Sequence, residues 1–350
     1  MRNVCVIGGS RYFGRDLVEL LRGAGSHVTV VNRGSVPAPH GVTQLVADRG
    51  DERQLRAVLG SRTFDVVLDQ VCYTPEQAAV ARRVFAGRTG RYVMTSTVEV
   101  YDPGTRTRAP ADPNSSPSLN PSPNPSPTPG LRPGPGPSPT PGLRPGPGVL
   151  LPVTEDRYDA VGRPAPGVPE GADAATAYAE GKRQAESVLL TEPVCPTAVV
   201  RTAHVLGGGR ADFTRRLAHY TDRISAGEPV VAHRRAYPTT FIHHREIAEF
   251  LHWTAGAPFT GPVNACSHGT LTVTELADLV GERAGRPPRY TLVGGGAAAS
   301  PFSYDRHYPM DNGRATGLGF VFGRVTDWMP QAVDEALAAS TSAVRDGGAR

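Results

Sequence analysis

The sequence predicts an α/β fold in which a Rossmann-type, doubly wound parallel sheet is joined to a smaller C-terminal lobe. Three observations support this fold class. Short apolar runs alternate with amphipathic stretches through the first hundred residues, a glycine-rich loop follows the first run, and the alternation becomes irregular after about residue 211. Because crossover helices must carry the chain back between parallel strands, the alternation indicates a doubly wound sheet.

Each predicted element follows from a local pattern. Apolar runs bounded mainly by Gly, Asp or Asn predict strands at 3–7, 27–32, 43–46, 65–68, 91–95 and 197–202, with a further short strand at 263–265 in the irregular part. Apolar residues spaced three and four apart predict helices at 15–22, 52–59, 75–86, 176–190, 213–224, 246–254 and 274–284. Thr272 or Thr274 is suited to cap the last of these helices.

A proline-rich segment interrupts this pattern. Sixteen of the 34 prolines lie between residues 103 and 149, and the twelve residues 125–136 are repeated at 137–148. Such a segment buries too little apolar surface to offset its ordering entropy, so it is expected to be a disordered surface insert. We therefore assign residues 1–102 and 151–210 to the Rossmann domain, 103–150 to the insert, and 211–340 mostly to the C-terminal lobe.

Composition limits the partners and the cellular setting. No apolar stretch approaches the ~18 residues of a membrane span, and we expect a cytoplasmic protein with no membrane partner. The four cysteines have neither zinc-ligand spacing nor a disulfide pattern. The net charge of +4 comes from scattered arginines, which is weak support for nucleic-acid binding. A homodimer is compatible with the sequence.

The glycine-rich loop predicts a dinucleotide cofactor. Gly8 permits a tight turn, Gly9 lets the backbone approach a pyrophosphate, and Gly14 lets the following helix pack closely on the strand. The N-terminus of that helix supplies N–H groups to the anion. The loop residues expected to contact the cofactor are Gly8, Gly9, Ser10, Arg11, Tyr12, Phe13 and Gly14.

The residues after the second strand indicate which cofactor binds. An NAD site usually has Asp or Glu there to accept hydrogen bonds from the adenosine ribose, whereas this chain has Asn32-Arg33-Gly34. The Arg33 guanidinium suits a 2′-phosphate, and Arg11 adds a second positive charge. NADP(H) is therefore favoured, and NAD(H) is the alternative.

Tyr178 and Lys182 form the candidate catalytic pair. They lie four residues apart on a predicted helix and hence on one face, and Lys182 is the only lysine in the chain. A neighbouring cation stabilises a phenolate. The pKa of Tyr178 is therefore expected to fall, which would make it a usable acid or base nearer neutral pH.

With these motifs the chain resembles the extended short-chain dehydrogenase/reductases, also called atypical, which form the NAD(P)-dependent epimerase/dehydratase family. The resemblance rests on the glycine loop, the run from Thr95 to Tyr101, the Tyr178–Lys182 pair, Phe241-Ile242-His243, Glu246-Ile247-Ala248 and residues 312–320. It implies that Tyr178 is the general acid/base, that Lys182 also binds the nicotinamide ribose, and that Thr97 shares a substrate hydroxyl. It also implies that Asp48 contacts adenine and that Glu99 is a candidate base.

The chain departs from the family pattern where nucleotide-sugar members bind their substrate. Arg201-Thr202-Ala203-His204 replaces the usual Arg-Tyr-x-Asn run, and Thr239 stands where epimerases carry a pyrophosphate-binding arginine, although Arg234 and Arg235 are near. His204, His243 and His244 are expected to pack or to contact substrate, and no metal site is expected because no carboxylate or cysteine completes a ligand spacing.

Three functions remain open at this point. The first is epimerisation or dehydration of a small-molecule substrate, a nucleotide-activated sugar, with hydride and proton exchange at one hydroxyl or carbonyl carbon. The second is an NADPH-dependent ketoreductase that acts on a small biosynthetic metabolite. The third is a non-catalytic NADP sensor or RNA binder, although such a protein has no need of the Tyr178–Lys182 pair.

Overall fold

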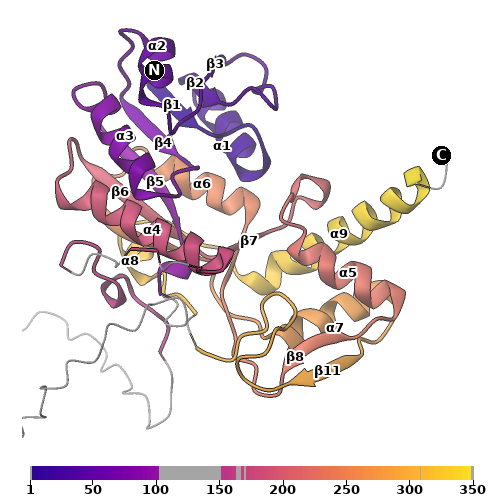
Figure 1. Cartoon of the computed structure of the whole chain (residues 1–350). Coiled ribbons are helices and arrows are strands. Elements are labelled where there is room, and N and C mark those ends of the chain that lie inside the picture. Colours follow the sequence, from indigo (N-terminus) through magenta and orange to yellow (C-terminus); the bar gives the residue numbers. More distant parts are fainter. Residues whose placement is uncertain (1, 102–150, 163–166, 169–170, 308, 348–350) are drawn as a thin grey trace, which may run out of the picture. The chain divides into compact units, whose positions relative to one another are not determined.

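The central sheet contains seven parallel strands in the order β10-β6-β5-β4-β1-β2-β3 (Figure 1). The computed structural model describes residues 2–101, 151–162, 167–168, 171–307 and 309–347. From β1 the chain first builds outward through β2 and β3, then crosses back to β4 and builds in the other direction. The order therefore reverses between β1 and β4, which is where open α/β sheets bind ligands.

The sheet strands agree closely with the sequence pattern. They are β1 (Asn3–Ile7), β2 (His27–Asn32), β3 (Thr43–Val46), β4 (Val66–Asp69), β5 (Tyr92–Thr97), β6 (Thr197–Thr202) and β10 (Gly261–Ala265). Four of them have the predicted bounds, and β4, β5 and β10 differ by one or two residues at their ends. The predicted doubly wound fold class is confirmed.

Helices cover both faces of the sheet. One face carries α2 (Glu52–Leu59), α3 (Pro75–Phe85) and α4 (Ala174–Thr191), and the other carries α1 (Tyr12–Gly23) and α6 (His244–Thr254). Side chains along a strand alternate between the two faces. In β1, Val4 and Val6 pack in the core beneath α1 and α6, whereas Cys5 and Ile7 pack in the core beneath α2, α3 and α4.

Polar caps fix where several helices begin. The Asp51 carboxylate accepts a hydrogen bond from the Gln54 amide (3.0 Å), and the Asp173 carboxylate accepts one from the Thr176 amide at the start of α4 (2.8 Å). Thr272 caps α7 (Val273–Ala284) in a reciprocal capping box with Glu275. Both Thr272 and Thr274 are suited to cap this helix by sequence, and in the structure the cap is Thr272.

The C-terminal lobe has its own apolar core. It contains α5 (Arg216–Ala226), α7 and α9 (Val325–Gly347) around a pair of parallel strands, β8 (Val230–His233) and β11 (Tyr290–Val293) (Figure 1). A second pair, β7 (His204–Leu206) and β9 (Phe241–His243), links the lobe to the sheet. The remaining elements are α8 (Gly313–Gly317) and the short 3₁₀ helices η1 (Val98–Tyr101), η3 (Glu155–Arg157) and η4 (Gly209–Ala211).

Several helix bounds and the domain division differ from those that the sequence predicts. Helix α1 begins at Tyr12 rather than at 15, and α4, α6 and α7 begin one or two residues earlier than predicted. Helix α5 begins at Arg216 rather than at 213, because Arg215 adopts a left-handed conformation (φ 51°). The chain also returns to the central sheet after residue 211: α6 packs on α1, and β10 pairs with β6. Residues between β11 and α9 also pack on the sheet side, so the C-terminal lobe is formed by three separate stretches of sequence.

Apart from Leu151, the described residues belong to one compact unit. The expectation of a disordered insert at 103–150 concerns residues that lie wholly outside the described part of the chain. Of the helices in the described residues, none combines the length and apolar character of a membrane span.

Candidate active site

The glycine loop between β1 and α1 leaves its backbone open to a ligand. Gly8 and Gly9 adopt positive φ angles of 95° and 75°, and the Gly8 amide donates a hydrogen bond to the Val31 carbonyl (2.9 Å). A Cβ at Gly9 would lie 2.7 Å from the Val6 side chain, and one at Gly14 would overlap the Gln70 side chain. Only glycine therefore fits at these positions, as the predicted phosphate-binding turn requires.

Tyr12 connects two cavities. It has a positive φ of 51°, and its buried ring stacks on His244 with centroids 5.7 Å apart. The ring lines both the large cavity described below and a neighbouring cavity of about 510 Å³ beside His244. Its hydroxyl is buried and has no hydrogen-bond partner among the described residues.

The end of β2 is arranged around Asn32. Its amide nitrogen donates to the Ser10 hydroxyl (2.5 Å), and its amide oxygen accepts hydrogen bonds from the Gly34 amide and the Gln44 side chain (both 2.9 Å). Asn32 thereby ties β2 to the glycine loop. Arg11, which follows Ser10, and Arg33, which follows Asn32, are both exposed.

Asp48 follows β3, the edge strand that pairs with β2. Its side chain is exposed, and its carboxylate accepts a hydrogen bond from the Gly50 amide (2.7 Å) in the turn before α2. The next residue, Arg49, is buried and forms an ion pair with Asp69 at the end of β4. The structure thus places Asp48 on a fixed turn at the carboxyl end of β3, where it remains a predicted adenine contact.

A cavity of about 810 Å³ opens at the carboxyl ends of the central strands. Its wall includes the predicted catalytic residues Thr97, Glu99, Tyr178 and Lys182, together with Tyr12 and Phe13 of the glycine loop. Residues predicted from three separate motifs therefore meet in one cavity. Their catalytic and binding roles remain predictions.

Tyr178 faces this cavity with 38% of its surface exposed. Burial of its hydroxyl raises the pKa to about 12, and a hydrogen bond with the Thr97 side chain opposes this rise in part. The expected lowering of the Tyr178 pKa is therefore wrong for this structure. Loss of hydration of the phenolate outweighs the favourable charges nearby, and the negative charge of Glu99 raises the pKa further.

Lys182 is buried beside Tyr178. Its ammonium donates a hydrogen bond to the Thr95 carbonyl (2.7 Å) and lies 4.6 Å from the Tyr73 ring centroid and 5.9 Å from that of Tyr178. Burial lowers the pKa of Lys182 to about 8, although Cys72, Asp69 and Glu186 act in the opposite direction. Burial of the charged ammonium of Lys182 therefore lowers the free energy of unfolding.

Helix α4 reaches the cavity through a close backbone contact. A Cβ at Gly181 would overlap the Tyr73 carbonyl oxygen, so the glycine between Tyr178 and Lys182 lets the helix lie directly on the loop after β4. Below it, Arg201 and Glu186 form a fully buried ion pair (2.7 Å), and Arg201 also donates to the Tyr101 hydroxyl (2.9 Å). These contacts fix α4 against β5 and β6.

Glu99 lies on η1, which is clamped from α4. Arg183 donates hydrogen bonds to the backbone carbonyls of Val100 (2.9 Å) and Glu99 (3.1 Å). The Glu99 side chain is half-buried, lines the cavity, and acts electrostatically on Tyr178. Its position is compatible with the proposed role as a base near the reacting carbon.

Several cavity residues were not predicted as site residues from the sequence. Tyr73 follows β4, and its place at the carboxyl end of a parallel strand is a signal that sequence reasoning could have used. Arg216, Tyr304 and Arg306 come from the C-terminal lobe and carried no recognisable motif. His204 is buried, stacks on Tyr304 and accepts or donates a hydrogen bond with its hydroxyl (3.0 Å).

The three histidines have different surroundings. Burial holds the pKa of His204 well below its usual range, so this side chain is neutral and acts by hydrogen bonding. His243 and His244 instead approach Glu335 of α9. The sequence argument that no carboxylate completes a metal-ligand set does not hold in three dimensions, because Glu335 is remote along the chain.

No protein-family model and no curated protein matches the sequence. Solved structures are similar over nearly the whole chain. UDP-glucose 4-epimerase from Thermotoga maritima, with UDP-glucose, is 15% identical, with a TM-score of 0.65 over 98% of this chain and 99% of that chain. UDP-glucose 4-epimerase from Thermus thermophilus, with NAD, is 18% identical, with a TM-score of 0.61 over 96% and 99%.

A dehydratase has the same architecture. dTDP-glucose 4,6-dehydratase from Bacillus anthracis, with NAD, is 11% identical, with a TM-score of 0.64 over 96% of both chains. At these identities the similarity establishes the fold. The chain therefore has the fold of nucleotide-sugar epimerases and dehydratases, as the sequence resemblance implied.

Proposed function

We propose that this protein is a nicotinamide-dependent oxidoreductase of the epimerase/dehydratase type, which exchanges a proton and a hydride at one hydroxyl or carbonyl carbon. The observation that carries the proposal is the single cavity that brings together the glycine loop, Thr97, Tyr178 and Lys182. The cavity lies at the carboxyl ends of the strands, where a sheet of this topology binds its ligands.

The residues present fit a dinucleotide. The glycine loop has no room for side chains at Gly9 and Gly14, and it leads into the N-terminus of α1, where backbone N–H groups suit a pyrophosphate. Lys182, which is buried and lines the cavity, is the residue that we expect to hold the nicotinamide ribose. When bound, the nicotinamide supplies the hydride donor or acceptor.

The protein's own residues handle the proton. With a pKa of about 12, Tyr178 is protonated at neutral pH and can donate its proton to a substrate carbonyl oxygen. Thr97, which is hydrogen-bonded to Tyr178, orients the phenol and shares the same substrate oxygen. In the reverse direction Tyr178 must first lose its proton, and the buried ammonium of Lys182 stabilises the phenolate that results.

We infer that NADP(H) is preferred. In the described structure Arg33 and Arg11 are exposed beside the glycine loop, and the polar group that ends β2 is the amide of Asn32 rather than a carboxylate. A carboxylate at this point would repel a 2′-phosphate, whereas a guanidinium forms charge-assisted hydrogen bonds with it.

The Arg33→Asp variant is expected to bind NADPH about 10- to 100-fold more weakly, because a charged hydrogen bond is worth roughly 1.5–3 kcal/mol. NADH affinity should stay unchanged or improve. Fluorescence titration with both cofactors measures the effect. Arg15→Asp is the matched control, since Arg15 is also an exposed arginine but lines the other cavity and is paired with Glu19. Equal NADPH affinities for the two variants would contradict the preference.

For the substrate we propose a nucleotide-activated sugar. Arg216 and Arg306 contribute positive charge to the cavity wall on the lobe side, where an anionic diphosphate would lie. His204 and Tyr304 form a neutral hydrogen-bonding pair at the same wall.

One observation favours an NADPH-dependent ketoreductase as the alternative. Thr239 is fully buried, its hydroxyl has no hydrogen-bond partner among the described residues, and its backbone pairs with that of Leu271. It therefore cannot replace the pyrophosphate-binding arginine of epimerases. A smaller carbonyl substrate would not require that contact.

The retention and redox state of a nicotinamide cofactor in the purified protein distinguish the epimerase/dehydratase from the ketoreductase. An epimerase or dehydratase regenerates its cofactor in each cycle, so we expect about one tightly retained nicotinamide dinucleotide per chain, identified by absorbance and by mass after denaturation. Incubation with UDP- and dTDP-sugars should then change the sugar without net cofactor turnover. A cofactor-free protein that binds added NADPH reversibly would contradict this function and support the reductase.

A further inference from the structure

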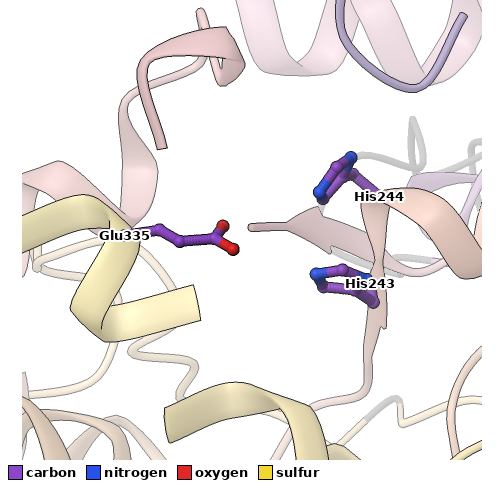
Figure 2. Close-up of side chains that lie close together, drawn as sticks. All are labelled: His243, His244 and Glu335. Atoms are coloured by element: carbon purple, nitrogen blue, oxygen red, sulfur yellow. The ribbon is translucent and has the colours of Figure 1, made fainter. Parts of the chain in front are cut away.

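His243, His244 and Glu335 converge from two parts of the chain (Figure 2). His243 ends β9, His244 begins α6, and the Glu335 side chain extends from α9 toward both imidazoles. One ligand atom from each residue lies within 4.8 Å of the others. The backbone at Gly207 packs against both rings, and a Cβ there would lie 2.7 Å from the Nε2 atom of His243.

Neighbouring groups orient two of these side chains. Asp16 of α1 lies 2.6 Å from the Nδ1 atom of His244, which assigns the ring proton to Nδ1 and leaves the Nε2 lone pair available. Metal-ligating histidines typically have such a carboxylate on the other ring nitrogen. Glu335 accepts hydrogen bonds from the Gly208 amide (2.8 Å) and the Gln331 side chain (3.0 Å).

We propose that His243, His244 and Glu335 bind one Zn²⁺ ion, with Asp16 as the supporting carboxylate. Two imidazoles and one carboxylate are a ligand set that zinc prefers, whereas Mg²⁺ and Ca²⁺ take mainly oxygen ligands. The negative charges of Glu335 and Asp16 balance the charge of the ion. The neighbouring cavity of about 510 Å³ gives room for a water molecule as the fourth ligand.

The distances require only small movements. An ion at the centre of three atoms that are at most 4.8 Å apart lies within about 2.8 Å of each, so shifts of roughly 0.7 Å reach the ~2.1 Å of zinc bonds. His244 is buried and held by Asp16 and by the Tyr12 ring, whereas Glu335 is half-buried on a helix surface. We therefore expect His244 to stay in place and Glu335 to move.

The ion would join three elements. It would connect α9 of the C-terminal lobe to the junction of β9 and α6 and, through Asp16, to α1, the helix that follows the glycine loop. Its role in this arrangement is a clamp that fixes the lobe against the dinucleotide-binding half.

Zinc titration of the untagged full-length protein after treatment with EDTA tests the proposal. Calorimetry with ZnCl₂ should show one equivalent per chain, and saturating zinc should raise the Tm by several degrees. Glu335→Gln should weaken zinc binding at least 100-fold. Asp16→Asn should weaken it about 10- to 100-fold with unchanged stoichiometry, as expected for a residue that positions a ligand.

Glu249→Gln is the matched control, because Glu249 is an exposed glutamate on α6 outside this site. It should bind zinc like the unaltered chain. Circular dichroism of each zinc-free variant verifies that the fold is retained. Less than half an equivalent of zinc in the unaltered chain, or equal affinities for Glu335→Gln and Glu249→Gln, would overturn the proposal.

Discussion

The Tyr178→Phe variant is expected to lose about 10²- to 10⁴-fold in kcat, the usual contribution of a general acid/base. The substitution removes the Tyr178 hydroxyl, which is hydrogen-bonded to Thr97, from the cavity wall. Because Tyr178 is 38% exposed and keeps its ring, the fold and the affinity for NADPH should be unchanged. Steady-state kinetics and cofactor titration of the same preparation measure both quantities.

Tyr73→Phe is the control for this experiment. Tyr73 lines the same cavity and also lies beside Lys182, but we assign its hydroxyl no role in proton transfer. This variant should retain activity within a few-fold. Full activity of Tyr178→Phe would contradict the proposed mechanism. Combined with salt-dependent binding of RNA, that result would instead indicate a non-catalytic binding protein.

The Lys182→Met variant is expected to lose activity and to gain stability. Activity should fall at least 100-fold, because the variant loses the charge that supports a Tyr178 phenolate and the contact predicted for the nicotinamide ribose. At pH 7 its free energy of unfolding should be about 1–3 kcal/mol higher than that of the unaltered protein. A shift of the lysine pKa from 10.5 to about 8 corresponds to a burial cost of up to about 3 kcal/mol.

The pH dependence of this stability difference follows from the same shift. Below about pH 8 the lysine is charged in both the folded and the unfolded chain, so the full cost of burying the charge is present. Between about pH 8 and 10.5 the folded protein loses this proton while the unfolded chain keeps it. The unaltered protein is stabilised over this range, and its difference from Lys182→Met should narrow.

Urea denaturation of both proteins between pH 7 and 10 measures this effect. Arg183→Met provides the contrast: the neighbouring buried cation is paired with Glu180 (2.8 Å), so its removal leaves a buried carboxylate without this partner and should destabilise the fold. A Lys182→Met protein that is less stable than the unaltered chain at pH 7 would contradict the interpretation.

The sequence predicted the Rossmann half well because its signals are local. Buried parallel strands are continuous apolar runs, and β1, β2, β3 and β6 have the bounds that those runs indicate. The glycine loop is equally local, since its turn, close approach and helix start lie within seven residues. The candidate catalytic pair is four residues apart on one helix.

The C-terminal lobe was less predictable because its contacts are distant in sequence. Strands β8 and β11 have four residues each, and they pair across about sixty residues. The position of β10 in the sequence predicts that it belongs to the lobe, but in the structure it pairs with β6 and extends the central sheet. Arg216, Tyr304 and Glu335 likewise reach their sites only through tertiary packing.

The Tyr178 pKa illustrates a different limit. Residue spacing showed correctly that a cation lies near the phenol, but spacing carries no information about hydration. In the folded chain the loss of water around the hydroxyl is the larger effect. Electrostatic expectations for this site therefore depend on burial, which the sequence does not specify residue by residue.

The position of Tyr12 has a thermodynamic consequence. Tyr12 forms part of the wall of both cavities, and its ring stacks on His244. A ligand that displaces this ring from either cavity changes the shape of both. If a ligand in one cavity changes the affinity of the other cavity for its own ligand by some factor, thermodynamic linkage requires that the second ligand change the affinity for the first by the same factor. Tyr12 is thus the residue through which two binding equilibria on this chain would be coupled.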